Sequence, residues 1–169
     1  MSSNKLRAAL LVCAVASAIA GCSSPAPAEH ASMASTVTFD DQWATSAETG
    51  MAAVFGTLTN SSDQDATIVS GESPASATVE LHEVTPDAAG NKTMRPKEGG
   101  ITVTAHSAKE LAPGGDHLML MELTQPLRPG AEVAMTVTFA DGSTLPIAAQ
   151  VRDFAGGDED YSPGPHGHG

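Results

Sequence analysis

The sequence predicts an all-β fold, a Greek-key antiparallel β-sandwich of the immunoglobulin-like kind, over residues 36–154. Short runs of alternating or β-branched residues recur about every 10–15 residues, and residues typical of tight turns separate them. No segment of this region shows a sustained helical period. Roughly seven or eight short strands at this spacing favour a two-sheet sandwich over a closed barrel, the alternative architecture.

The expected strands follow in chain order at residues 37–43, 51–59, 66–70, 78–84, 101–104, 117–123, 133–139 and 144–151. The segments between them are rich in Asn, Asp, Pro and Gly, whose backbones adopt turn conformations readily, at 60–63, 86–90, 113–116, 129–130 and 141–142. Pro146 lies inside the last run and has no amide hydrogen to donate. We therefore expect that strand to lie at a sheet edge or to carry a bulge.

The first 21 residues have the features of a signal peptide. Lys5 and Arg7 precede an uncharged apolar run of 13 residues, 8–20. This run is too short to cross a bilayer core of about 30 Å. It leads into Gly21 and Cys22, which resemble a bacterial lipobox. We expect cleavage before Cys22 and lipidation of this cysteine, which would anchor an extracytoplasmic protein to the cell membrane. The alternative is an ordinary signal peptide that is cleaved elsewhere.

Two flanking segments differ in composition from the sandwich region. Residues 22–35 are small and polar, which predicts a flexible linker from the anchor to the domain. Residues 155–169 are rich in Gly, Pro and acidic residues and end in two histidines, which predicts a disordered tail.

Cysteine content and charge exclude several classes of function. The chain has two cysteines: Cys13 would leave with the signal peptide, and Cys22 would carry the lipid. The mature domain would then have no thiol for nucleophilic catalysis, thiol redox chemistry or a blue-copper site. Loss of Lys5 and Arg7 would also change the formal net charge from −12 to −14, which argues against nucleic acid or anionic lipid headgroups as partners.

The strand at residues 117–123 holds two potential metal ligands. Successive side chains of a strand point to opposite faces, so His117, Met119 and Met121 would share one face. Leu118, Leu120 and Glu122 would share the other face, where the leucines supply core. Residues two apart on a strand lie about 6.5–7 Å from each other, so the His117 imidazole and the Met119 thioether can converge on one ion. The same pattern also arises where methionine fills a core.

Two further residues extend this ligand set. His82 alternates with Val79 and Leu81, which places its side chain on the polar face of the strand at 78–84. Met94 lies in a polar stretch where a core methionine is not expected. Thioethers favour Cu(I) over hard cations, and imidazole accepts either copper oxidation state. Zinc would be expected to use more histidine, cysteine or carboxylate. The residue types therefore predict a Cu(I) site.

Several of these segments together resemble the PCuAC family of periplasmic copper chaperones. They are residues 79–83, 94–96, 111–121 and 127–130, and the similarity extends over most of 37–151. The family motif corresponds to His82, Met94, His117 and Met119, with 11, 22 and 1 residues between them. Some relatives carry Met where this chain has Glu83, and the gap before His117 is one residue longer than the commonest spacing.

The resemblance implies a cupredoxin-like β-sandwich that binds Cu(I) outside the cytoplasm. It also implies transfer of the ion by ligand exchange to a copper-accepting protein, such as a cytochrome c oxidase subunit or assembly factor. A donor must release its ion, so we expect a shallow, partly exposed site. Met121 is either an accessory ligand or a packing neighbour of the site. His166 and His168 could add imidazoles from the tail, whereas His106 is expected to be a solvated loop residue.

Three alternatives to copper delivery stay open at this point. Copper sequestration for tolerance would use the same ligands, and a metal-free interaction or adhesion module would use the same strands. An enzyme is the least supported alternative, because the chain has no nucleophile elbow, no available thiol and no evident pair of carboxylates in a cleft.

Overall fold

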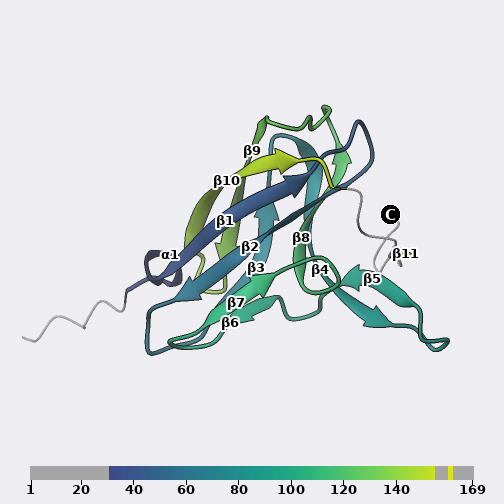
Figure 1. Cartoon of the computed structure of the whole chain (residues 1–169). Helices are drawn as coiled ribbons and strands as arrows, with labels where there is room; N and C mark the ends of the chain where they lie inside the picture. The colour runs from purple at the N-terminus through teal and green to yellow at the C-terminus, as the bar shows by residue number, and fades with distance from the viewer. Residues whose placement is uncertain (1–30, 155–159, 162–169) are drawn as a thin grey trace, which may run out of the picture.

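The computed structural model describes residues 31–154 and 160–161 (Figure 1). Its elements are α1 (Met33–Thr36), β1 (Val37–Thr45), β2 (Ala52–Asn60), β3 (Ala66–Glu72), β4 (Ser76–Pro86), β5 (Lys92–Pro96), β6 (Ile101–Val103), β7 (Ala108–Leu111), β8 (His117–Leu123), β9 (Glu132–Phe139), β10 (Thr144–Arg152) and β11 (Asp160–Tyr161). The eight expected strands are present, and the predicted all-β fold class is confirmed. Strands β5, β7 and β11 were not predicted, because they are short and lack a clear apolar alternation.

One continuous pairing order connects most of the strands. It runs β11-β5-β4-β8-β2-β1-β10-β9-β3-β6, and β7 pairs with β2 beyond β8, on the side of β2 away from β1. A single residue pair, Gly71 with Val79, also joins β3 to β4. The two sheets of the sandwich are therefore linked at both sides, so the sandwich shares some of the character of the barrel alternative.

Two pairings are parallel and differ from the antiparallel expectation, namely β1 with β10 and β11 with β5. The β1–β10 pairing covers Gln150 to Arg152 only, so Pro146 on β10 pairs with β9 alone. Proline is tolerated there because its missing amide hydrogen faces no second strand. Strand β10 as a whole lies between β1 and β9, so it is not the edge strand that was expected; only the part that carries Pro146 has a single pairing partner.

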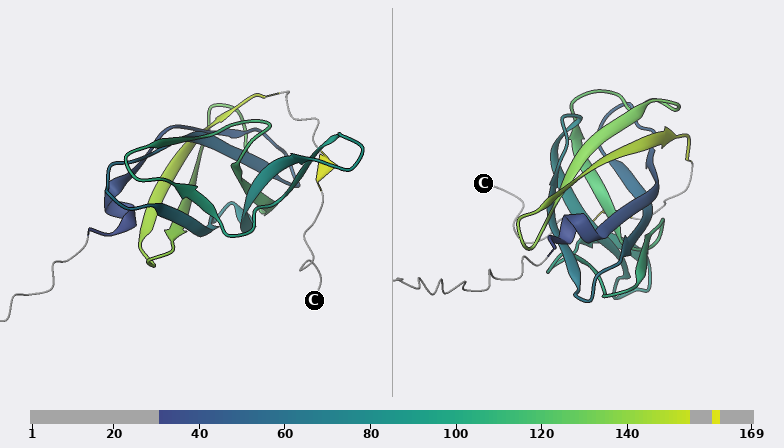
Figure 2. Two further views of the ribbon diagram at one scale, coloured as in Figure 1. Left: turned by 90° about the horizontal axis from the view of Figure 1, so that it is seen from below. Right: turned by 90° about the vertical axis from the view of Figure 1, so that its left-hand side faces the viewer.

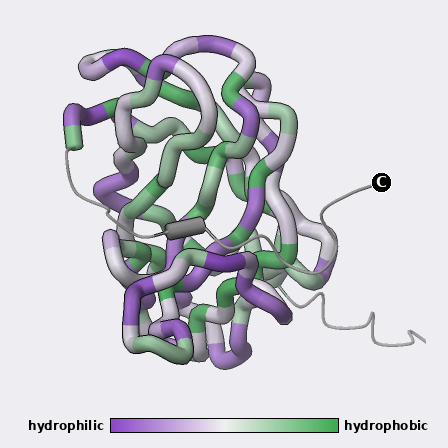
Figure 3. Tube along the Cα trace, turned by 90° about the vertical axis from the view of Figure 1, so that its right-hand side faces the viewer, coloured by the Kyte–Doolittle hydropathy of each residue, from purple (hydrophilic) through white to green (hydrophobic). Residues whose placement is uncertain are grey.

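The main core lies between the two sheets and follows from alternation along the strands. On β9, Val133, Met135, Val137 and Phe139 are buried, and the residues between them are more exposed. Each large apolar side chain that is fully buried contributes about 1.5–3 kcal/mol to folding. Hydrophobic and hydrophilic residues alternate along the trace in the same way in Figure 3.

A bulge in β1 changes which residues face outward. The register with β2 shifts by one residue between Asp40 and Trp43, and Asp41 has a φ of 53°. Val37 and Phe39 before the bulge point into the main core, as does Ala44 after it. The extra residue therefore places Trp43 on the outer face of the sheet, opposite Phe55 of β2.

The two ends of the domain are more ordered than the composition predicts. Met33 and Ala34 of α1 pack against the core, and the Met33 amide donates to Asp141 Oδ2 at 2.7 Å. The last residues of the expected linker 22–35 thus form part of the domain. In the described part of the chain no helix is long and apolar enough to cross a membrane.

Strand β11 lies within the expected disordered tail. It lies beside β5 (Figure 2) and pairs with it in parallel, Asp160 with Thr93 and Tyr161 with Met94. The signal peptide, Cys22 and the histidines His166 and His168 lie outside the described residues.

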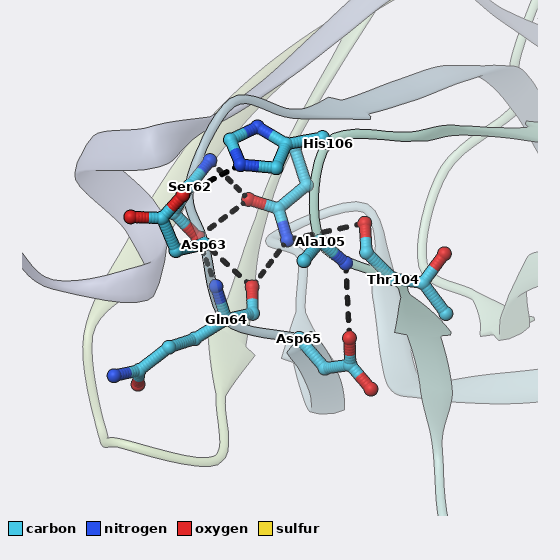
Figure 4. A network of polar contacts seen from close by, with 8 residues as sticks. Ser62, Asp63, Gln64, Asp65, Thr104, Ala105 and His106 are labelled. Carbon is cyan, nitrogen blue, oxygen red and sulfur yellow. Dashed lines mark hydrogen bonds and ion pairs between the residues drawn. The ribbon is translucent and has the colours of Figure 1, made fainter.

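Buried Asn60 takes part in a polar network of loop residues, and Figure 4 labels its neighbours at 62–65 and 104–106. Its Nδ2 donates to the carbonyls of Gln64 at 2.7 Å and Val103 at 3.1 Å, and its Oδ1 accepts from Ser62. His106 lies in this network, where its Nε2 is 2.6 Å from Asp63 Oδ1, and its side chain is exposed. His106 is therefore a solvated loop residue, as predicted.

Candidate metal centre

Strands β4, β5 and β8 bring the four predicted ligands onto one outer face of the sheet. Across β4 and β8, His82 pairs directly with His117. Met94 on β5 pairs with Val84 of β4, and Met119 on β8 pairs with Ala53 of β2. The neighbouring leucines of β4 and β8 point the other way, into the main core: Leu81, Leu118 and Leu120.

The most specific contact joins His117 to Met94. The Nε2 atom of His117 lies 2.9 Å from the Met94 sulfur, and its Nδ1 lies 3.0 Å from the Gly115 carbonyl oxygen. A carbonyl can only accept, so Nδ1 carries the hydrogen, and a neutral imidazole then has its lone pair on Nε2. The Nε2 lone pair of His117 therefore faces the Met94 sulfur with no proton between the two atoms. This arrangement suits a soft cation shared by both atoms.

His82 completes a pair of imidazoles. Its ring is fully buried, and its centroid lies 5.5 Å from that of His117, nearly perpendicular to it. Two imidazoles that share one ion through bonds of about 2 Å place their ring centres about 5 Å apart at a tetrahedral angle. The described residues contain no group of three or more His, Cys, Asp or Glu side chains that could hold a metal ion.

The four side chains are buried, so the expectation of a shallow, partly exposed site is wrong. Exposure is 0% for His82, 3% for His117, 4% for Met119 and 8% for Met94. They are covered because this face carries a second apolar cluster, to which Ala53, Phe55, Trp43, Val84 and Met121 contribute. Alternation in a sequence assigns a side chain to a face but does not say how deeply that face is covered.

Aromatic rings form one wall of the centre. The Phe55 ring lies 5.7 Å from the His117 ring and 4.7 Å from Trp43. Phe154 packs edge-on against Trp43 at 5.1 Å, and the Arg152 guanidinium lies 5.5 Å from the Trp43 ring centre. These residues exclude water from the His117 side of the centre.

Burial lowers the pKa of His117 below its ordinary value, because desolvation disfavours the imidazolium. The nearby His82 lowers the pKa further, whereas the hydrogen bond to Gly115 and the charge of Asp116 partly offset this. The neutral form, which can bind a metal ion, is therefore favoured.

An ionic network braces the strands that carry the ligands. Lys97 Nζ lies 2.8 Å from Glu83 and 3.3 Å from Asp116, while Lys109 and Arg95 pair with Asp116 and Glu83. Hydrogen bonding to Lys97 is the main cause that lowers the pKa of Glu83. Desolvation would raise the pKa of Asp116, but the hydrogen bonds and charges of Lys109 and Lys97 outweigh it.

The end of β8 departs from the predicted alternation. Met121 is half-buried and packs against the second apolar cluster beside Met119. Glu122 was expected on the leucine face, but its φ of 53° breaks the alternation and its side chain is exposed. Leu123 packs against the main core in its place.

Sequence reasoning missed Glu80, whose Oε2 lies 2.7 Å from His82 Nε2. Its position two residues before His82 places it on the same face of β4, and this spacing could have revealed the contact. The Gly115 carbonyl was also missed, since backbone acceptors leave no signal in side-chain patterns.

The fold and this face define a β-sandwich domain of the PCuAC type. More particularly, a family model described as "Putative lipoprotein LpqE-like" matches residues 37–151, and the chain belongs to this lipoprotein family. A similar curated protein is "Putative lipoprotein Lxx21020" from Leifsonia xyli subsp. xyli (strain CTCB07). It is 37% identical over 161 residues, which cover 94% of this chain and 96% of the relative.

Solved PCuAC structures share the fold. The copper-bound PCuAC domain from PmoF2 is 21% identical, with a TM-score of 0.60 over 74% of this chain and 99% of that one. The solution structure of CuI-DR1885 from Deinococcus radiodurans is 32% identical, with a TM-score of 0.53 over 72% of this chain and 83% of that one. The resemblance to PCuAC proteins drawn from the sequence is confirmed.

Proposed function

We propose that this protein is a copper chaperone, anchored by a lipid at Cys22 outside the cytoplasm, that binds Cu(I) through His82, Met94, His117 and Met119. The observation that carries this proposal is the 2.9 Å contact between His117 Nε2 and the Met94 sulfur, with the other nitrogen held by Gly115. Two similar solved structures, the copper-bound PCuAC domain from PmoF2 and CuI-DR1885, support the same metal.

The chemistry of the four side chains favours the monovalent ion. Two thioethers and two neutral imidazoles provide a soft, uncharged ligand set, which suits Cu(I) better than a hard divalent cation. Thioether sulfur does not titrate, so only the histidines would make binding depend on pH.

Delivery would proceed by ligand exchange, in which the acceptor's ligands replace those of this protein one at a time. Met94 belongs to β5, which only the two-residue strand β11 separates from the end of the sheet order, whereas the other proposed ligands lie on the more central strands β4 and β8. We therefore expect Met94 to be the first ligand replaced. A cytochrome c oxidase subunit or assembly factor is the acceptor that the family resemblance favours.

The burial of all four side chains favours a second candidate function, copper sequestration for tolerance, since buried ligands retain an ion well. A deletion strain separates the two candidates: loss of assembled oxidase supports delivery, whereas copper sensitivity with normal oxidase supports sequestration. Neither candidate function requires the protein to catalyse a reaction.

The double variant Met94→Leu, Met119→Leu tests the ligand set. Leucine keeps most of the volume, so folding should change by less than about 1.5 kcal/mol per site. Cu(I) affinity should fall about 100-fold or more, measured by competition with a chromogenic Cu(I) chelator on the chain from Ser23 to Gly169. The matched control is Met135→Leu, which changes a buried methionine in the main core. Unchanged affinity in the double variant would contradict the proposal.

Met121, His166 and His168 remain proposed accessory ligands. Removal of residues 162–169 takes away both tail histidines but keeps β11. Lower copper stoichiometry in the truncated chain, at an unchanged Cu(I) affinity of the main centre, would assign the two tail histidines an accessory role.

A further inference from the structure

We propose that Glu80 is a positioning residue of the metal centre: its carboxylate holds the His82 ring so that Nδ1 is the nitrogen that binds copper. This inference rests on the copper-binding function proposed above. It adds a residue outside the four-ligand set and assigns which atom of His82 is the ligand.

The contact between Glu80 and His82 fixes the tautomer of the imidazole. Glu80 Oε2 lies 2.7 Å from His82 Nε2, and an ionised carboxylate can only accept. Nε2 therefore carries the hydrogen, and the lone pair of the neutral ring is on Nδ1. His117 has the opposite arrangement, because Gly115 accepts from its Nδ1. The two histidines would thus bind one ion through different nitrogens.

The position of Glu80 suits this role. It lies on the same face of β4 as His82 and pairs across the sheet with Met119, so it is beside two of the proposed ligands. Its side chain is 34% exposed, whereas His82 is fully buried. The carboxylate therefore lies at the rim of the centre and keeps part of its hydration, which limits the cost of placing a charge there.

Three physical effects would follow from this contact. The hydrogen bond restricts rotation of the ring, so less ordering is needed when copper binds. A carboxylate that accepts from one ring nitrogen makes the other nitrogen a stronger donor. The negative charge also offsets the charge of Cu(I) inside a buried set of neutral ligands.

The neighbouring carboxylate of β4 has a different role. Glu83 pairs with Lys97 and Arg95, whereas Glu80 pairs with a predicted ligand. Two nearby acidic residues of one strand can therefore be distinguished by their partners, and the sequence alone does not show which of them serves the centre.

The test compares Glu80→Gln and Glu80→Ala with Glu132→Gln, which removes the same charge from an exposed position on β9. In the first variant the side-chain amide oxygen still accepts a hydrogen bond, so Cu(I) affinity should fall about 10-fold. Alanine removes the acceptor, and the loss should approach about 100-fold. The control variant should bind as the wild type does, and circular dichroism checks that each variant is folded.

A second readout needs no variant. Long-range ¹H–¹⁵N spectra of the Cu(I)-loaded wild-type chain report which nitrogen of each histidine binds metal. We expect His82 to be metallated at Nδ1 and protonated at Nε2, with the reverse for His117. Metallation of His82 at Nε2 would overturn the assignment.

The outcomes separate this inference from the proposed function. If His82→Asn binds Cu(I) as tightly as the wild type, the proposed copper centre fails, and the role of Glu80 fails with it. If His82→Asn loses binding while both Glu80 variants match Glu132→Gln, the copper centre stands and only the role of Glu80 is overturned.

Discussion

Three properties of His117 bear on metal binding. It is almost fully buried, its Nδ1 donates to the Gly115 carbonyl, and its Nε2 faces a thioether. Burial alone would make it an ordinary core histidine. The orientation of Nε2 toward Met94 is the observation that supports its proposed role in copper binding.

The lowered pKa of His117 predicts how stability depends on pH. The unfolded chain takes up a proton near the ordinary value of about 6.5, whereas the folded chain does so only at lower pH. The free energy of unfolding should therefore be highest above about pH 6.5 and decrease as pH falls through that window. Urea unfolding of the metal-free chain at pH 7.5, 6.5 and 5.5 measures it.

The variant His117→Asn should reduce the pH dependence of the free energy of unfolding, since it removes the imidazole whose pKa is lowered. His106→Asn, which changes an exposed histidine, should leave the dependence as it is. An equally steep loss of stability in His117→Asn would show that other groups cause it.

At the scale of elements, the proposed metal centre depends most on the β4–β5 hairpin. It supplies Met94 and His82, and it lies at the outer end of the sheet, away from α1 (Figure 1). Strand β5 has few apolar residues of its own. The ionic network around Lys97 therefore contributes to holding it against β4 and the segment before His117.

The variant Lys97→Met should weaken the ionic network that holds β5 against β4. Its ion pairs are partly exposed, so the free energy of unfolding should fall by only about 0.5–1 kcal/mol. Cu(I) affinity should fall a few-fold, on the order of 1 kcal/mol or less, because Met94 would be held less firmly relative to His117. Chemical denaturation and the Cu(I) competition titration measure the two effects.

Lys92→Met is the matched control, since Lys92 is an exposed residue at the start of the same strand. The difference between the two variants should shrink at about 1 M salt, where exposed ion pairs are screened. Equal effects of both substitutions would argue against a specific role of the network.

At the scale of the whole molecule, the sequence was sufficient for the fold class, eight strands and the strand faces of His82, His117 and Met119, but not for that of Met94, whose strand β5 was not predicted. These depend on alternation and turn residues, which are local. The depth at which these side chains are buried was not predictable. Trp43 reaches the outer face only because of the bulge at Asp41, and the burial of His82 depends on several strands together. The parallel β1–β10 pairing joins residues more than a hundred positions apart, for which no local signal exists.

The C-terminal segment provides a prediction at this scale. Strand β11 pairs with β5 beside Met94, so removal of residues 155–169 should expose the backbone of β5. Amide hydrogen exchange should become faster at residues 92–95 and stay unchanged in β8. Removal of residues 162–169 alone, which keeps β11, should have no such effect. Equal protection of β5 in both truncations would show that β11 does not stabilise it.

Trp43 is the one tryptophan of the chain. Because it packs against Phe55, which in turn contacts His117, an ion held by His117 would lie within short range of this indole ring. Indole fluorescence should therefore report copper occupancy of the proposed centre. It can be recorded during transfer to an acceptor, with no dye attached and no competing chelator in the solution.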